Sequence, residues 1–221
     1  MKLRSRPVRG RGLLFAALVG AVCLAGCGGE GNPSSGNGNG DNNNGGNING
    51  GGGGSGEYVE LGGLKWMKKN LNVETANSYC YNNSPDSCAR YGRLYTWSAA
   101  MTVCPSGWRL PSRVEWGELA KAAGGTGDYG ASGTAGTKLK STGGWYNNGN
   151  GTDAYGFTAL PGGDRFSGGS FTSAGYGGSW WAATEYGSGD AYYRYVYYLN
   201  DYVYEGYLSK DDAFSVRCVR D

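Results

Sequence analysis

The chain has 221 residues and a formal net charge of +2, and it contains 44 glycines, 18 tyrosines and no histidine. The absence of histidine excludes Ser-His-Asp and Cys-His catalysis, zinc sites with histidine ligands and pH switches that depend on imidazole. No apolar run reaches the roughly 18 residues of a membrane-spanning helix, so the composition indicates one globular domain with an appendage.

The first 27 residues have the pattern of an export signal. Five basic residues precede an apolar stretch at 13–25, and small residues then lead into Cys27. This order resembles a bacterial lipobox, which implies cleavage before Cys27 and acylation of its thiol and new amine. The alternative is an ordinary secretory signal with an unrelated cysteine. Because Gly28 rather than aspartate follows, the resemblance implies a lipid anchor in the outer membrane, with the protein exposed at the cell surface.

The predicted mature chain differs in charge from the whole sequence. All 18 acidic residues lie beyond Cys27, but five of the 20 basic residues precede it, which leaves 15 − 18, or −3. This balance gives no electrostatic support to a nucleic-acid partner. Residues 28–56 are mostly glycine and asparagine, and such a tract cannot bury enough apolar surface to offset its conformational entropy. We therefore predict a flexible tether between the membrane anchor and a domain at 57–221.

The domain begins with a predicted hairpin. Residues Tyr58–Leu61 and Leu64–Met67 flank the pair Gly62–Gly63, which favours a two-residue turn between two strands. Further along, Arg93–Met101 has apolar side chains at helical spacing, so we expect a short helix there.

The clearest helix signal lies at Ser112–Ala123. Ser112 and Glu115 have the spacing of a capping box, in which each side chain satisfies a backbone N–H at the start of the helix. From Gly124 to Gly178 the pattern disappears. We expect an elaborate loop region pinned by its aromatic side chains, because unstructured loops of that length are uncommon in compact domains.

The last part of the domain is predicted to be a sheet. Ser179–Glu185 has the pattern of a buried strand. Tyr192–Leu199 and Tyr202–Leu208 flank Asn200–Asp201, which tolerates a tight turn, and Ala213–Val219 would close the sheet. Two helices followed by antiparallel strands predict an α+β fold.

Four cysteines lie within the predicted domain, and an even number in an exported domain predicts disulfides. Of the three possible pairings we predict Cys80–Cys88, because the turn-rich segment 82–86 can fold the chain back. The second bridge would then be Cys104–Cys218, which ties the end of the domain to its middle. The alternative, a reactive thiol pair or a metal site, lacks a C-x-x-C motif and histidine.

Aromatic residues are the main candidates for ligand contact. Trp180 and Trp181 are adjacent, so on a strand they point to opposite faces, and we expect one in the core and the other along a surface groove. Exposed rings suit stacking on sugars or packing on a protein. The structural alternative is that tyrosine covers a half-solvated sheet because of its strand propensity. The predicted ligand contacts are Trp145, Tyr146, Trp180, Tyr193 and Tyr195.

Five segments of the domain follow one another in a distinctive order. They are Gly63–Met67 with Lys69–Leu71, Tyr91–Trp97, Cys104–Ser112 with Glu115 and Trp116, Trp180–Glu185 and Ser215–Asp221. In order and spacing they resemble the Fibrobacter succinogenes major paralogous domain, from about Tyr58 to the C-terminus. This resemblance implies an exported bacterial surface protein.

A second resemblance concerns the fold. Residues 109–112, Glu115 with Trp116, and residues 216–219 are similar to sulfatase-modifying enzymes that generate formylglycine. This implies a C-type-lectin-like α+β fold with two short helices, antiparallel strands and a long Gly/aromatic-rich loop region. Those enzymes use a redox-active cysteine pair with copper, for which this sequence offers no counterpart beyond the four cysteines already assigned to disulfides. The Glu-Pro-Asn and Gln-Pro-Asp triplets of calcium-dependent lectins are missing from it as well.

Other candidate chemistry rests on weaker patterns. Glu115 and Trp116 could form a site, but the capping box accounts for Glu115 and a place in the core accounts for Trp116. A carboxylate pair could hydrolyse glycosides or hold calcium, but no spacing singles out a pair. The acids available for such a pair are Asp153, Asp164, Glu185 and Asp190.

We expect a surface lipoprotein whose domain binds without catalysis, with no cofactor and no metal. Its partner would be a polysaccharide or another envelope protein, in an adhesion-type role. The alternative is an enzyme, either a carboxylate-based glycan hydrolase or an oxidase related to the sulfatase-modifying fold. A structural envelope protein is a third alternative.

Overall fold

The computed structural model describes residues 58–126 and 132–221. The predicted signal segment, Cys27 and the predicted tether at 28–56 lie outside these described residues. Within the described ranges, no helix is long and apolar enough to cross a membrane. This part of the chain is mixed α/β, with four short helices and sheets in which most strand pairs are antiparallel.

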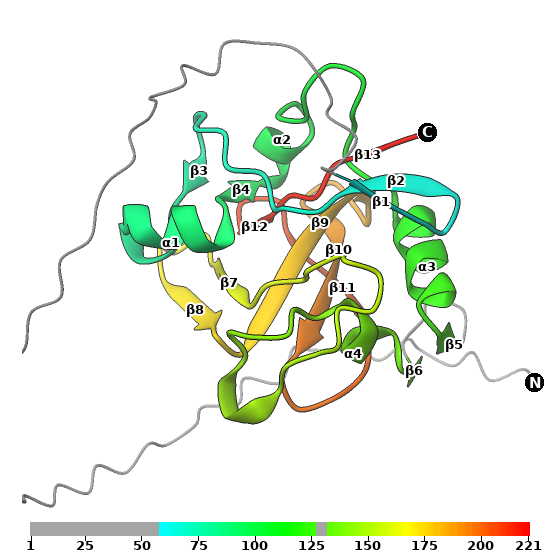
Figure 1. The fold of residues 1–221 in the computed structure, drawn as a ribbon. Coiled ribbons are helices and arrows are strands. Elements are labelled where there is room, and N and C mark those ends of the chain that lie inside the picture. The colour runs from blue at the N-terminus through cyan, green and yellow to red at the C-terminus, as the bar shows by residue number, and fades with distance from the viewer. Residues whose placement is uncertain (1–57, 127–131) are drawn as a thin grey trace, which may run out of the picture. The chain divides into compact units, whose positions relative to one another are not determined.

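One large sheet runs through the domain (Figure 1). Its two longest strands are β9 (Gly177–Glu185) and β10 (Asp190–Tyr197), which pair antiparallel; β9 contains the strand predicted at 179–185. β11 (Tyr204–Ser209) pairs with β10, so the predicted tyrosine hairpin is present, with a connection longer than Asn200–Asp201. The other strands of this sheet are β3 (Ser78–Tyr79), β4 (Leu94–Thr96), β7 (Gly162–Arg165), β8 (Phe171–Ala174) and β12 (Ala213–Ser215).

A smaller sheet brings the start of the domain against its end. β1 (Tyr58–Leu61) and β2 (Leu64–Met67) form the predicted hairpin, and both glycines between them have positive φ, 61° and 82°. β13 (Val219–Arg220) pairs with β2. The strand predicted at 213–219 is therefore two strands, because the chain leaves the large sheet after β12 and joins the small sheet at β13. A separate two-stranded sheet consists of β5 (Gly125–Thr126) and β6 (Ser132–Gly133).

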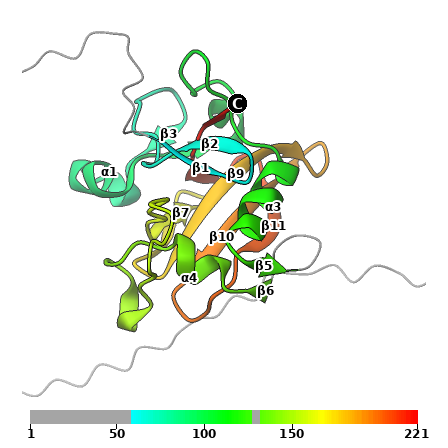
Figure 2. The same cartoon turned by 45° about the vertical axis from the view of Figure 1, so that its right-hand side comes forward.

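Helix α3 (Arg113–Ala122) confirms the clearest helix prediction. The Glu115 N–H donates to Ser112 Oγ at 3.3 Å, and the Ser112 N–H donates to Glu115 Oε2 at 2.7 Å, which completes the capping box. Trp116 and Leu119 on this helix are buried against the large sheet. Figure 2 shows α3 beside β9 and β10.

One helix expectation needs correction, and two further helices were not predicted. The helix expected at Arg93–Met101 begins only with α2 (Trp97–Ala100), because the preceding strand β4 pairs with β3 and β12. Helix α1 (Pro85–Tyr91) occupies a segment that reads as a turn, and its proline lies in the first turn, where the missing N–H costs nothing. The stretch without a pattern contains α4 (Ala135–Leu139) and short strands.

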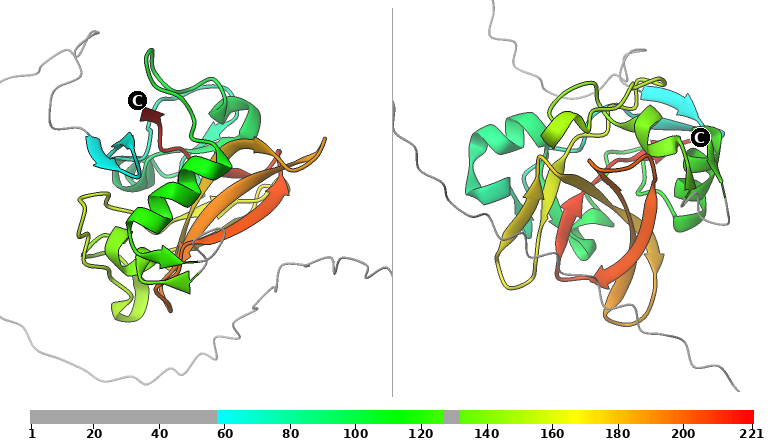
Figure 3. Two further views of the ribbon diagram at one scale, coloured as in Figure 1. Left: turned by 90° about the vertical axis from the view of Figure 1, so that its right-hand side faces the viewer. Right: turned by 90° about the horizontal axis from the view of Figure 1, so that it is seen from below.

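The large sheet separates two hydrophobic clusters. Trp180 packs against Trp116 in one cluster, and Trp181 packs against Phe214 in the other, with ring centroids 4.3 Å apart. Their opposite orientation confirms the prediction, but the expected surface groove beside one of them is wrong. Both indoles are buried, at 2% and 0% exposure, because both faces of the sheet are covered. The left view of Figure 3 shows α3, in green, along one face of the orange strands.

Both predicted disulfides are present. Cys80–Cys88 joins the middle of α1 to the residue that follows β3, and Cys104–Cys218 joins the segment after α2 to the C-terminal strand region. The second pair is 114 residues apart in the chain. In the chain-entropy model a loop of that length contributes about 4–5 kcal/mol.

The guanidinium of Arg217 is completely buried next to the second disulfide. It donates to Asn70 Oδ1 at 2.8 and 3.1 Å and to the carbonyls of Met67, at 2.9 Å, and Phe157. The indole N–H of Trp180 donates to the same Asn70 oxygen at 2.8 Å. Burial lowers the pKa of Arg217, and the surrounding acceptors offset the cost of burying its charge. We call Arg217, Asn70 and Trp180 the arginine node.

A second buried polar group lies on β7. Asp164 Oδ1 is sealed from solvent and has no hydrogen-bond partner among the described residues. Burial raises the pKa of Asp164 to about 7; a hydrogen bond with Ser173 opposes this rise, and the charge of Asp212 adds to it. Between about pH 4 and pH 7 the folded chain therefore holds a proton that the unfolded chain releases. Stability should fall as the pH rises through this window.

The arginine node predicts unequal effects of two substitutions at residue 70. Asn70→Ala removes the oxygen that accepts from Arg217 and from Trp180, so we expect the free energy of unfolding to fall by about 3–5 kcal/mol. Asn70→Asp keeps that oxygen and adds a counter-charge, but it removes the amide nitrogen that donates to the Tyr91 carbonyl at 2.8 Å, so its loss should be smaller than that of alanine and not zero. Chemical denaturation followed by tryptophan fluorescence measures both. An alanine variant within about 1 kcal/mol of the wild type would contradict the role of the node.

The acid on β7 predicts a pH-dependent stability. The free energy of unfolding should fall by on the order of a few kcal/mol between about pH 4 and pH 7, and Asp164→Asn should remove most of that slope. The control is Asp86→Asn, at an exposed position on α1. Thermal unfolding across this pH range measures the three proteins. A variant that keeps the full slope of the wild type would show that another group causes it.

Candidate functional site

Four tyrosines form a cluster at one end of β10, and two of them are open to solvent. Tyr146 lies 4.5 Å from Tyr176 and 5.4 Å from Tyr198 between ring centroids, and Tyr197 lies 4.8 Å from Tyr198. Tyr146 and Tyr176 are 51% and 39% exposed. We call Tyr146, Tyr176, Tyr197 and Tyr198 the tyrosine platform.

Three separate parts of the chain build the tyrosine platform. Tyr146 begins the short 3-10 turn η2 (Tyr146–Asn148), Tyr176 lies in the turn between β8 and β9, and Tyr198 follows β10. The Tyr146 N–H donates to the Gly175 carbonyl at 2.8 Å, and the Tyr198 N–H donates to the Tyr176 carbonyl at 2.9 Å. These backbone bonds hold the rings together independently of the side chains.

A buried lysine supports the tyrosine platform. Lys140 is only 2% exposed, and its ammonium donates to the carbonyls of Asn200 at 3.1 Å and Tyr197 at 3.4 Å. It also lies 5.4 Å from the ring centroid of Trp145. Burial lowers the pKa of Lys140, and the charge of Asp201 opposes that effect. The lysine thus fixes the loop that follows β10 against the loop that carries Tyr146.

The tyrosine platform is uncharged and offers both apolar and polar contacts. Burial raises the pKa of Tyr197, and the neighbouring phenols Tyr198 and Tyr176 raise it further, so the phenol stays protonated at neutral pH. Flat rings can lie on the apolar face of a sugar, while phenol hydroxyls donate and accept hydrogen bonds at its edge.

The five predicted ligand contacts lie in different environments. Tyr146 belongs to the tyrosine platform. Trp145 and Trp180 are buried, at 5% and 2% exposure, and their indole N–H groups donate to protein oxygens, so neither ring is open to a ligand in this structure. Tyr193 is half-buried, with its ring close to Gly206 and tilted against Phe214 at 4.7 Å between ring centroids. These contacts account for the packing of Tyr193. In the sequence analysis, the alternative to ligand contact was the strand propensity of tyrosine alone.

Tyr195 belongs to a separate row of rings. It stacks with Tyr193 at 5.6 Å and with Tyr204 on β11 at 4.8 Å. The structure therefore does not bring the five predicted residues into one site. The sequence pattern missed Tyr176 and Tyr198, because only the turn after β8 places them beside Tyr146.

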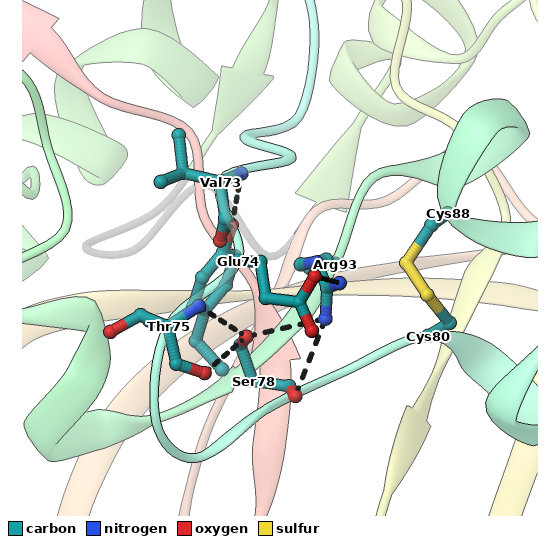
Figure 4. Close-up of a disulfide and its surroundings, with 8 residues drawn as sticks. Val73, Glu74, Thr75, Ser78, Cys80, Cys88 and Arg93 are labelled. Atoms are coloured by element: carbon teal, nitrogen blue, oxygen red, sulfur yellow. Dashed lines mark hydrogen bonds and ion pairs between the residues drawn. A yellow bond between two sulfur atoms is a disulfide. The ribbon is translucent and has the colours of Figure 1, made fainter. Parts of the chain in front are cut away.

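An open cleft of about 630 Å³ lies beside the Cys80–Cys88 disulfide. Figure 4 shows Glu74 reaching Arg93 across this region, with 2.8 Å between the charged groups. Arg93 also lies 3.4 Å from Ser78 Oγ. The residues that line the cleft are Asn72, Glu74, Ser78, Tyr79, Cys80, Asn83, Pro85, Cys88, Ala89 and Arg93.

Two of the four acids considered for catalysis or calcium binding form contacts within the fold. Asp153 accepts from the backbone and hydroxyl of Thr158 at 2.6 and 2.7 Å, and Glu185 pairs with Lys210 at 3.0 Å. Glu115 completes the capping box of α3. Residues 58–126 and 132–221 contain no group of three or more acids or cysteines placed to hold a metal ion.

Comparison with known proteins identifies one family. Residues 59–220 match the model of the Fibrobacter succinogenes major domain (Fib_succ_major). Neither the curated proteins nor the solved structures contain a significant match. The matched range covers most of the chain and includes the segments whose order carries the sequence resemblance. The chain therefore belongs to the Fibrobacter succinogenes major domain family.

Proposed function

We propose that the protein is a surface lipoprotein whose domain binds glycans through the tyrosine platform. The observation that carries this proposal is the pair of open rings, Tyr146 and Tyr176. Their centroids lie 4.5 Å apart, and backbone hydrogen bonds hold the segments that carry them. Rings that are already held in place lose little freedom when a ligand binds, which favours affinity. An envelope protein is the alternative partner, since exposed tyrosines also serve protein interfaces.

The proposed anchor and tether explain why such a domain would be presented outside the cell. Cys27 would carry the lipid, and the 29 residues from Gly28 to Gly56 would extend about 30 Å root-mean-square as a glycine-rich coil. A tethered domain samples many orientations, so a weak binding surface can meet an immobile polymer.

We also propose that the domain does not catalyse a reaction and that its fold is distantly related to C-type-lectin-like proteins. The four cysteines of the described residues form two disulfides, which argues against a redox-active thiol pair. The packing of a capped helix α3 against β9 and β10 is compatible with the lectin-like comparison, as are the long loops before β7.

Binding through the tyrosine platform predicts a selective loss in the double variant Tyr146→Ala/Tyr176→Ala. We expect retention on a polysaccharide panel (cellulose, xylan, mannan, starch and chitin) to weaken at least about tenfold, because both open rings are lost. The matched control is Tyr186→Ala/Tyr207→Ala, which removes another exposed pair, stacked 3.6 Å apart. Affinity electrophoresis and pull-down measure retention.

Two results would contradict this proposed function. The first is a wild-type protein that none of the polysaccharides retains. The second is a platform variant that binds as well as the wild type while the Tyr186/Tyr207 control loses binding.

A further inference from the structure

The tripeptide Tyr-Asn-Asn occurs twice in the domain with the same backbone shape. It forms the 3-10 turn η1 (Tyr81–Asn83) and the turn η2 (Tyr146–Asn148). The asparagines have left-handed φ values of 52° and 56° in the first turn and of 48° and 59° in the second. Among the described residues, only these two turns hold consecutive non-glycine residues in that region.

Asparagine is the non-glycine residue that most readily adopts this conformation, and in these turns it also brings a functional group. Left-handed conformations cost a non-glycine residue about 1–3 kcal/mol, and glycine avoids this cost. The hairpin between β1 and β2 also needs two consecutive left-handed residues, and it uses Gly62 and Gly63. Asparagine tolerates the conformation, but it adds a side-chain amide that glycine lacks.

The four amides are available to a ligand. Asn82, Asn83, Asn147 and Asn148 are all exposed, and within the described residues none of their side chains donates or accepts a hydrogen bond. Each primary amide offers two donors and one acceptor in a plane, a set that matches neighbouring hydroxyl groups. Asn83 also lines the cleft beside Cys80–Cys88.

The two turns pack against opposite ends of one strand. Tyr81 lies 5.4 Å from Phe171, the first residue of β8, and Tyr146 lies 4.5 Å from Tyr176, which closely follows that strand. Five residue steps separate Phe171 from Tyr176, so these anchor points are at most about 18 Å apart. One polysaccharide chain can therefore reach both turns. Figure 1 shows β8 beside α1, the helix that follows the first turn.

We infer that the protein binds one extended, hydroxyl-rich polysaccharide chain at two like subsites, one at each Tyr-Asn-Asn turn. This inference rests on the proposed function and goes beyond it, because it names a polymer that spans β8. At each subsite a tyrosine, half-buried in the first turn and exposed in the second, is followed in the chain by two exposed asparagines. Two weak contacts with one polysaccharide chain together give a higher overall affinity, because the second contact forms at a high effective concentration.

Replacing asparagine by glycine tests the amides without disturbing the backbone. The variants are Asn82→Gly/Asn83→Gly and Asn147→Gly/Asn148→Gly in the full chain, with Asn77→Gly as the control, a single left-handed asparagine with φ 60° outside both turns. The probes are intact xylan, mannan and mixed-linkage glucan, together with xylobiose, mannobiose and cellobiose. Calorimetry measures affinity and stoichiometry, and thermal unfolding confirms the fold.

We expect each double variant to bind the retained intact chain at least about tenfold more weakly than the wild type, with the control unchanged. Disaccharide stoichiometry should fall from two per protein to one in each double variant. Wild-type binding of the intact chain by Asn82→Gly/Asn83→Gly would overturn the two-subsite inference. If Tyr146→Ala/Tyr176→Ala lost binding in the same assay, the proposed function would still stand. A wild type that binds none of these six probes and none of the polysaccharides of the earlier panel would remove the proposed function itself.

Discussion

A buried positive charge sets the arrangement of the loops. Arg217 has no carboxylate within hydrogen-bond distance among the described residues, and its donors reach Asn70 and the backbone of residues 67 and 157–158. An unsatisfied guanidinium in the core would cost several kcal/mol, so these loops must converge on it for the chain to fold. The adjacent Cys104–Cys218 bridge holds the same C-terminal segment covalently.

This constraint extends from the core toward the surface. The loop at 157–158 that accepts from Arg217 leads into β7, which pairs with β8, and the turn after β8 carries Tyr176. Backbone hydrogen bonds then join that turn to Tyr146 and Tyr198. A continuous path of hydrogen-bonded segments therefore connects the arginine node to the tyrosine platform. It explains how a loop-rich region can hold its aromatic side chains in fixed positions.

Local signals made part of this structure predictable. The hairpin at Gly62–Gly63, the capped helix α3 and both disulfides depend on short-range spacing or on cysteine counting. Helix α1 was not predictable in the same way, because its proline and polar residues also favour turns. Of the candidate site, only Tyr146 could be named from the sequence as part of the tyrosine platform. Its partners come from segments whose proximity depends on the pairing of β7, β8 and β9.

Native-state amide hydrogen exchange tests the rigid connection between core and surface most directly. The amides of Tyr146 and Tyr198, which donate within the tyrosine platform, should exchange with the same free energy of opening as the Leu71 amide, which donates to the Val216 carbonyl beside the arginine node. Equal values would show that surface and core open as one cooperative unit. Rapid exchange of both tyrosine amides, with Leu71 still protected, would contradict the account.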